Sequence, residues 1–283
     1  MTSLLLSRLG ALVLALTYFS GCAISPGSVK WHDKSNLLLV AQEKNAEQVN
    51  AVSGRKKVIY AAFALHSDST AFQGDVTLAR DVLRSINSQM SVLLLSNQLE
   101  YSDIVYPFAM KENVKSVLSN VARSADKDTL VLLLFTSHGS PNLLSIKIGY
   151  GDYSTNLSTE ELRSYLEDLK AIPTIIIISA CYSGSFVPAL ANENRIIITA
   201  ASKDRVSFGC SSESKATYFI EEFFRHNFDA SMSLSELFSQ ANRQVAEREK
   251  RGNFTASQPQ IFVGERMKKF VSVPLRELLT KIE

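Results

Sequence analysis

Two apolar runs, each followed by a polar segment and a glycine, most constrain the fold of this chain. Residues 130–135 read Leu-Val-Leu-Leu-Leu-Phe before Thr-Ser-His-Gly, and residues 175–178 are four isoleucines before Ser-Ala-Cys-Tyr-Ser-Gly. Such runs, bounded by turn residues, are typical of strands buried on both faces of a parallel sheet. Ligands bind at the carboxyl ends of these strands, so neighbouring strands would place His138 and Cys181 side by side at one functional edge.

Further apolar runs alternate with helical repeats between residues 58 and 263. The predicted strands cover residues 58–65, 92–95, 130–135, 175–178, 195–199 and 260–263. The predicted helices cover residues 75–86, 112–123, 158–170 and 233–251, and the last two open with Ser-x-x-Glu capping boxes. Residues 143–150 predict a small hairpin. This alternation predicts an α/β fold with a mostly parallel sheet and helices on both of its faces.

The N-terminal residues resemble an export signal. Arg8 is the first charge, an apolar stretch follows at residues 9–19, and Ser-Gly-Cys stands at residues 20–22. A basic start, a short apolar core and small residues at its end are typical of a cleaved signal peptide rather than a membrane span. The cysteine makes the segment similar to a bacterial lipoprotein signal, in which Cys22 is lipidated. An ordinary cleaved signal or an uncleaved N-terminal anchor is the alternative.

The expected organisation follows from these segments. Residues 1–21 are expected to be the signal peptide and residues 22–57 a polar, lipidated tether that continues into a short helical or loose segment. Residues 58–270 are expected to form one domain, and residues 271–283 a tail with a short amphipathic helix. The chain has 30 basic and 28 acidic residues, and this near-neutral balance argues against a nucleic-acid partner. There is no Cys-x-x-Cys spacing and the four histidines are scattered, so no metal site is expected.

The residue types at the predicted sheet edge suit acyl transfer. A thiol nucleophile needs a base beside it, and Cys181 with His138 would meet that requirement. The backbone N–H groups of Gly139 and Cys181 are candidates to stabilise an oxyanion. Two plainer interpretations are a structural role for His138 and a disulfide between Cys181 and Cys210, because an oxidising compartment favours pairing of the two thiols.

The two motifs also resemble those of a known family. Ser-His-Gly at residues 137–139 and Ala-Cys-Tyr-Ser-Gly at residues 180–184 are similar to the catalytic motifs of the legumain family of cysteine peptidases, relatives of caspases and gingipains. The segments 73–75, 199–201, 208–210, 217–219 and 257–260 match further family features in the same order. The resemblance implies a caspase–hemoglobinase fold, a three-layer α/β sandwich with a six-stranded, mainly parallel sheet. It also implies Cys181 as nucleophile, His138 as general acid–base, and no metal or organic cofactor.

The departures from the family concern substrate choice. Legumains place acidic residues on both sides of the Ala-Cys pair, where this chain has Ser179 and Tyr182. The asparagine that helps orient the catalytic histidine in legumains falls on Ser69. An acidic residue of the specificity pocket falls on Glu221, which is either a substrate contact or a solvated helix carboxylate. Further candidates for substrate contact are Ser207 and His66.

The sequence therefore predicts a cysteine endopeptidase for peptide or protein substrates, held in the bacterial envelope by lipid on Cys22. Ala23 stands where an aspartate would signal retention at the inner membrane, so the resemblance favours the outer membrane, facing the periplasm. Two alternatives stay open. An amine could resolve the thioester instead of water, giving a transpeptidase or transamidase, or the domain could be a catalytically silent, caspase-like binding module. The oligomeric state is not predicted.

Overall fold

The chain folds around one six-stranded sheet. The computed structural model describes residues 26–50, 57–98, 104–149, 153–226 and 228–280. In spatial order the strands are β2 (Ser91–Ser96), β1 (Val58–Ala64), β3 (Leu130–Thr136), β7 (Thr174–Ser179), β8 (Arg195–Thr199) and β9 (Gln260–Val263). Neighbours run parallel except β9, which is antiparallel to β8. All six predicted strands are present, and the mostly parallel sheet confirms the predicted fold class.

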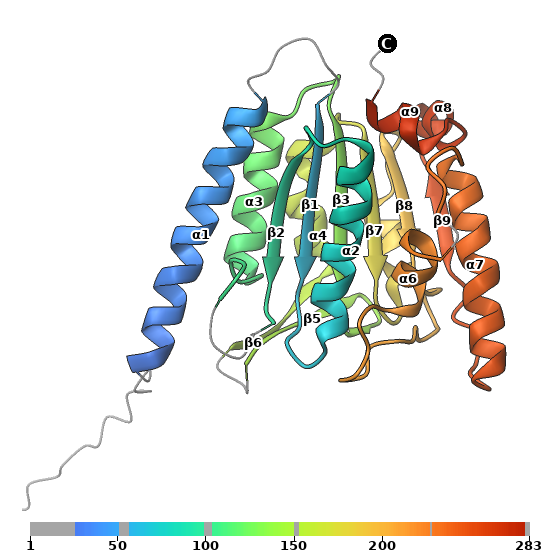
Figure 1. The fold of residues 1–283 in the computed structure, drawn as a ribbon, viewed down its shortest axis with the longest axis horizontal. Helices are drawn as coiled ribbons and strands as arrows, with labels where there is room; N and C mark the ends of the chain where they lie inside the picture. Colours follow the sequence, from blue (N-terminus) through green and yellow to red (C-terminus); the bar gives the residue numbers. More distant parts are fainter. Residues whose placement is uncertain (1–25, 51–56, 99–103, 150–152, 227, 281–283) are drawn as a thin grey trace, which may run out of the picture.

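Helices cover both faces of this sheet, so the molecule has three layers (Figure 1). One face packs against α2 (Thr70–Ile86), α6 (Tyr218–Phe224), α7 (Leu234–Arg251) and α9 (Leu275–Thr280). The other face packs against α3 (Lys111–Ser124), α4 (Thr159–Tyr165) and α5 (Val187–Leu190). The short helical turns are η1 (Glu167–Leu169), η2 (Ser183–Phe186), η3 (Glu265–Met267) and α8 (Lys268–Val271).

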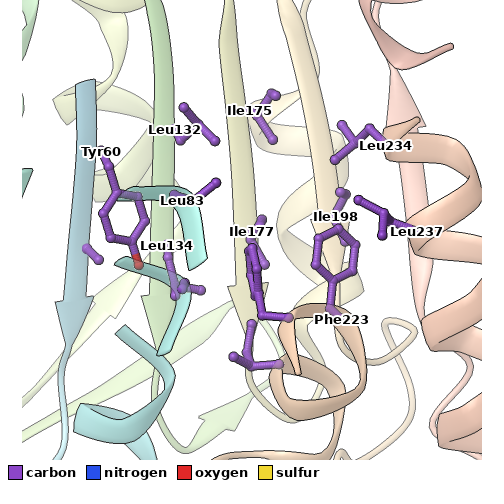
Figure 2. Packing of buried hydrophobic residues seen from close by; sticks show 14 of the residues in the cluster. Tyr60, Leu83, Leu132, Leu134, Ile175, Ile177, Ile198, Phe223, Leu234 and Leu237 are labelled. Carbon is purple, nitrogen blue, oxygen red and sulfur yellow. The ribbon is translucent and has the colours of Figure 1, made fainter. Parts of the chain in front are cut away.

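The core consists of two apolar layers, one on each face of the sheet. Successive strand residues point to opposite faces, so each central strand contributes to both layers. Figure 2 shows the layer under α2, α6 and α7, which includes Tyr60, Leu83, Leu134, Ile177, Phe223 and Leu237. In the opposite layer the rings of Phe63 and Phe135 stack with centroids 4.8 Å apart. Burial on both faces explains why the strand sequences are continuously apolar rather than alternating.

Three elements differ from their predicted bounds. Helix α2 begins at Thr70 instead of residue 75, because Ser69 caps it: the Ser69 Oγ accepts the Ala71 N–H at 3.1 Å. The predicted helix at residues 158–170 ends at Tyr165 and continues as η1. Residues 143–150 contain only the first strand of the hairpin. A second antiparallel sheet joins β4 (Gly139–Ser140), β5 (Leu143–Ile148) and β6 (Tyr153–Ser158).

The segment expected to be a tether with a short helical or loose part contains a helix of 25 residues. Residues Pro26–Asn50 form α1, which lies along edge strand β2 and α3 (Figure 1). Gln42 Oε1 accepts the Leu94 N–H of β2 at 3.2 Å, and Ser35 Oγ accepts the Phe108 N–H at 2.6 Å. The full extent of this helix is hard to predict because its aliphatic residues are consecutive, at residues 37–40, instead of spaced three and four apart.

The predicted organisation places a signal peptide at the N-terminal end of the chain and a tail at its C-terminal end. The predicted signal peptide and Cys22 lie outside the described residues. Among the residues that are described, no helix has the length and apolar character to cross a membrane. Near the C-terminus, α9 forms within the segment expected to hold a short amphipathic helix, and its Leu275, Leu278 and Leu279 are buried.

Candidate active site

The carboxyl ends of β1, β3 and β7 lie at one edge of the sheet, beside β5 and β6 (Figure 1). In the parallel register Thr136 lies opposite Ser179, and the next amide, Ser137 N–H, donates to the Ser179 carbonyl at 3.2 Å. His138 and Cys181 each follow this pair by two residues. The strand pairing therefore brings the two motifs together at the predicted edge.

Gly139 packs directly against the segment that carries Cys181. A Cβ atom at residue 139 would clash with the Cys181 carbonyl oxygen and would lie 3.1 Å from the Ala180 Cβ, so this close approach requires glycine. The Ser145 N–H donates to the His138 carbonyl at 2.9 Å, and Gly139 faces Leu144 in the same antiparallel ladder. Hydrogen-bonded and non-hydrogen-bonded pairs alternate along an antiparallel ladder, so Gly139 and Leu144 form a non-hydrogen-bonded pair. The ladder therefore leaves the Gly139 N–H free for a ligand.

Cys181 lies in a tight turn between β7 and η2. The next residue, Tyr182, has a left-handed backbone with φ 57°, and its N–H donates to the Arg205 carbonyl at 2.7 Å. Cys181 is partly exposed, and its Sγ accepts the Ser207 N–H at 3.3 Å. A strained backbone held by such contacts is a feature of many functional sites. Predicted residues Tyr182 and Ser207 thus lie beside the thiol.

The His138 ring packs against two other rings, which also contact each other. The His66 ring lies edge-on with its centroid 4.6 Å away, and the Phe72 ring lies edge-on at 5.0 Å. Burial lowers the pKa of His138, and the nearby carboxylate of Asp68 partly offsets this effect. The neutral imidazole, which can accept a proton from a thiol, is therefore favoured near neutral pH.

His66 is part of this edge but is almost fully buried, with 6 % of its surface exposed. Its Nδ1 accepts the Asp68 N–H at 3.2 Å, which places the proton of the neutral ring on Nε2. Burial, together with the neighbouring His138, lowers the pKa of His66 to about 4. The Asp68 carboxylate pairs with Lys147 at 2.9 Å. His66 is therefore a neutral neighbour of His138, and contact with substrate stays a prediction.

Two predicted residues are engaged by structural partners. Ser69 Oγ caps α2 and donates to the Ser211 carbonyl at 2.7 Å, and no hydrogen bond joins it to His138 within the described chain. The side chain of Glu221 is 15 % exposed and forms ion pairs with Arg225 at 2.7 Å and Arg248 at 2.9 Å. The histidine-orienting role of Ser69 and the substrate-binding role of Glu221 thus receive no support from these contacts.

Ser179 belongs to a buried polar cluster that the sequence analysis did not identify. Its Oγ lies 2.8 Å from Thr217 Oγ1, and Thr217 donates to Asp75 through both its N–H and its hydroxyl, at 2.8 and 2.9 Å. Thr136 Oγ1 donates to the same carboxylate at 2.6 Å. Burial raises the pKa of Asp75 to about 7, although these hydrogen bonds oppose the rise. The sequence feature that could have indicated this cluster is the hydroxyl residue at the end of each of two apolar strands, Thr136 in β3 and Ser179 in β7.

A second thiol, that of Cys210, lies near Cys181. Cys181 and Cys210 are both free thiols. Burial raises the pKa of Cys210, and the nearby Cys181 raises it further. Within the part of the chain that the structure describes, no group of three or more histidine, cysteine and acidic residues could hold a metal ion.

A comparison with known protein families gives a match that includes both motifs. The model of the peptidase C13 family matches residues 108–269, more than half of the chain, and this range contains β3, β7 and the residues that follow them. No curated protein matched the chain. The family match agrees with the three-layer architecture and with the predicted resemblance. The chain therefore belongs to the peptidase C13 family, the legumain family of cysteine peptidases.

Proposed function

We propose that the protein is an endopeptidase in which Cys181 is the nucleophile and His138 is the general acid–base. The observation that carries this proposal is the pairing of β3 with β7, which brings both motifs to one sheet edge. The close packing of Gly139 against Cys181 supports it. Membership of a cysteine peptidase family supplies the reaction class, since the family acts on peptides or proteins.

In the proposed reaction the neutral His138 ring accepts the thiol proton of Cys181. The sulfur attacks the peptide carbonyl carbon, and the resulting imidazolium gives its proton to the leaving amine. A thioester to Cys181 remains. Water then loses a proton to His138 and attacks the thioester, which releases the acid and restores the thiol. The lowered pKa of His138 supports this cycle, because the base form persists below pH 6.5.

The Gly139 and Cys181 N–H groups are the proposed oxyanion donors. Gly139 N–H lies outside the hydrogen bonds of its ladder, whereas Tyr182 N–H is used by Arg205. Backbone donors fixed by surrounding structure need no reorganisation when charge develops on the substrate oxygen. The turn that fixes Cys181 therefore suits stabilisation of a tetrahedral intermediate.

The proposed location is the bacterial envelope, with lipid on Cys22 and the domain on the periplasmic side of the outer membrane. The basic start, apolar core and small residues before Cys22 support this proposal. Labelling of growing cells with a clickable fatty acid tests it directly. Label on the unmodified protein and none on Cys22→Ala is expected, and equal labelling of both would contradict lipidation.

The decisive test of the reaction uses protein that lacks residues 1–22 but retains α1. This protein, Cys181→Ala and His138→Ala are each incubated with a diverse peptide mixture under reducing conditions, and products are identified by mass spectrometry. Internal cleavage by the unmodified protein alone is expected. Cys210→Ala is the matched control, because it removes the neighbouring thiol, and it should cleave the same bonds.

The outcomes separate the alternatives. Products joined to an added amine, with little hydrolysis, would indicate a transpeptidase or transamidase. If all variants are folded, none cleaves, and Cys181 reacts no faster than Cys210 with iodoacetamide, the proposed enzyme is wrong and a binding module is favoured.

A further inference from the structure

The strand ends that precede the proposed dyad are linked to a buried carboxylate that the reaction itself does not use. Asp75 of α2 is fully buried, as are Thr136 at the end of β3 and Ser179 at the end of β7. Thr217, which precedes α6, is 4 % exposed and bridges Asp75 to Ser179. One carboxylate thus connects α2, the strand before His138, the strand before Cys181, and the segment that begins α6.

The partners of Asp75 are all neutral hydrogen-bond donors. Its oxygens accept from Thr136 Oγ1, Thr217 Oγ1 and the Thr217 N–H, at 2.6, 2.9 and 2.8 Å. No lysine or arginine pairs with it in the described parts of the chain. A buried carboxylate without a cation destabilises a fold unless its hydrogen bonds compensate. Its hydrogen-bond links to the strand ends that precede His138 and Cys181 point to a role in the site.

The hydrogen bonds of this cluster have a defined direction when Asp75 is ionised. Each threonine hydroxyl has one proton, and both protons go to the carboxylate. Thr217 Oγ1 can then only accept from Ser179, so the Ser179 hydroxyl donates its proton to Thr217. Protonation of Asp75 would add a donor and require one hydroxyl to turn. The orientation of Ser179, two residues before Cys181, therefore depends on Asp75.

The same cluster holds the last paired position of the two strands. Thr136 and Ser179 are register partners, and Ser137 N–H donates to the Ser179 carbonyl immediately beyond them. Movement of either strand end would change the separation of His138 and Cys181, and a small displacement of reacting groups is costly in rate. The charged or titratable groups near Asp75 are Glu221 on α6, Tyr60 on β1 and Cys210.

We propose that Asp75 is a positioning residue: through Thr136, Thr217 and Ser179 it fixes the ends of β3 and β7, and thereby the approach of His138 to Cys181. This inference rests on the proposed dyad and adds to it a residue on α2 that touches neither substrate nor the reacting atoms. Asp75 acts through the three hydroxyl groups, so removing single hydroxyls should reproduce part of its effect.

The first test compares Asp75→Asn with the unmodified protein. Asparagine preserves the size of the side chain but presents N–H donors toward hydroxyls that need an acceptor. We expect kcat to fall roughly 10- to 100-fold, with KM little changed, because binding surfaces stay intact while the reacting groups move. Asp81→Asn is the matched control, since Asp81 is an exposed carboxylate on the same helix, and it should retain the unmodified kcat.

A pair of variants at residue 217 covers the case in which Asp75→Asn does not fold. Thr217→Ser retains the hydroxyl and its hydrogen bonds, whereas Thr217→Val removes the hydroxyl at nearly constant volume. We expect Thr217→Ser to keep most of the activity and Thr217→Val to lose it. Equal activities in these two variants would overturn the proposal, as would unmodified kcat in a folded Asp75→Asn.

A readout without substrate separates this inference from the proposed function. The rate at which iodoacetamide alkylates Cys181 is measured from pH 5 to 9, with the modified peptide identified by mass spectrometry. Slower alkylation and a displaced pH profile in Asp75→Asn and Thr217→Val, but not in Asp81→Asn, are expected even if no peptide is cleaved. Identical profiles in all four proteins would overturn the positioning role, whatever the outcome of the cleavage assay.

Discussion

The body of the sheet and its carboxyl edge are held together by different forces. In the body, aliphatic and aromatic side chains fill both faces, and Phe63 and Phe135 are fully buried within one layer. At the edge, only one to three residues further along the same strands, polar contacts take over: Asp75 with its threonines, and His66 with Asp68. Apolar packing is non-directional, whereas these hydrogen bonds fix particular atoms.

This difference predicts which substitutions should affect the stability of the fold and which should affect catalytic activity. Loss of a large side chain in the body leaves a cavity, and its cost falls on the free energy of unfolding. Loss of a hydrogen bond at the edge moves groups near Cys181 and His138 but exposes little apolar surface. The predictions below test this division from the largest expected effect to the smallest.

Phe135→Ala should give the largest loss of stability. The ring is fully buried and stacks on Phe63, so its removal should lower the unfolding free energy by about 3–5 kcal/mol in urea titrations. Any activity that is left at low temperature should have unmodified KM. Phe254→Ala is the control, since this ring is 44 % exposed. A loss in Phe135→Ala no greater than in the control would contradict the division.

The pH dependence of stability should show two opposing contributions at the edge. Asp75 has a pKa near 7 in the fold against an ordinary 3.8, so the folded state binds more protons between these values and stability falls as pH rises. His66 has a pKa near 4 against 6.5, so the unfolded state binds more protons and stability rises over that window. The two contributions largely cancel between about pH 4 and 6.5.

Single variants should reveal each contribution. His66→Gln removes the contribution of the histidine and retains that of Asp75. The free energy of unfolding of this variant, relative to that of the unmodified protein, should therefore fall by roughly 3 kcal/mol from pH 4 to 7. Asp75→Asn should show the opposite slope. Urea unfolding at several pH values measures both, with His226→Gln as a control at a half-exposed histidine. Parallel pH profiles for the two variants would show that these assignments are wrong.

Substitutions of two buried serines should have different effects, one mainly on stability and the other mainly on activity. Ser233 caps α7 in a capping box, and Ser233→Ala should destabilise the protein by about 1 kcal/mol without changing kcat. Ser179→Ala removes the outermost hydroxyl of the Asp75 cluster, and it should lower kcat with a stability loss of about 1 kcal/mol or less. An unchanged kcat in Ser179→Ala would remove Ser179 from the site.

Glu221→Gln should have the smallest effect. The carboxylate is paired with Arg225 and Arg248, so the substitution should cost about 1 kcal/mol or less and leave the choice of cleaved residue unchanged. Cleavage of a peptide library by the variant and by the unmodified protein provides the comparison. A changed residue preference would restore the substrate-binding role that the sequence analysis considered for Glu221.

The sequence predicts the body of the sheet better than its edge, for a physical reason. Buried parallel strands need only uninterrupted apolar residues and turn signals, both visible locally at residues 130–139 and 175–184. The two strand ends carry the family motifs, so His138 and Cys181 could be identified as candidates together. The adjacency of β3 and β7 also follows from a parallel sheet in which consecutive strands tend to be neighbours.

The remaining features depend on contacts between distant residues. Asp75 meets Thr217 across 142 positions, and Glu221 meets Arg248 across 27, so no local pattern reveals either interaction. Ser69 occupies a position of the family pattern, yet its hydroxyl caps α2 and binds Ser211. Local sequence can indicate that a polar residue is present at an edge, but its partner is set by tertiary packing.

The position of α1 has a practical consequence for anyone who divides this protein into fragments. A shortened chain that begins at residue 57 would leave the outer side of β2 uncovered, with the Leu94 N–H no longer matched by Gln42. An uncovered edge strand is a template for pairing with the same strand of another molecule. Such a fragment should self-associate, which light scattering would detect, whereas a fragment that begins before Pro26 should stay dispersed.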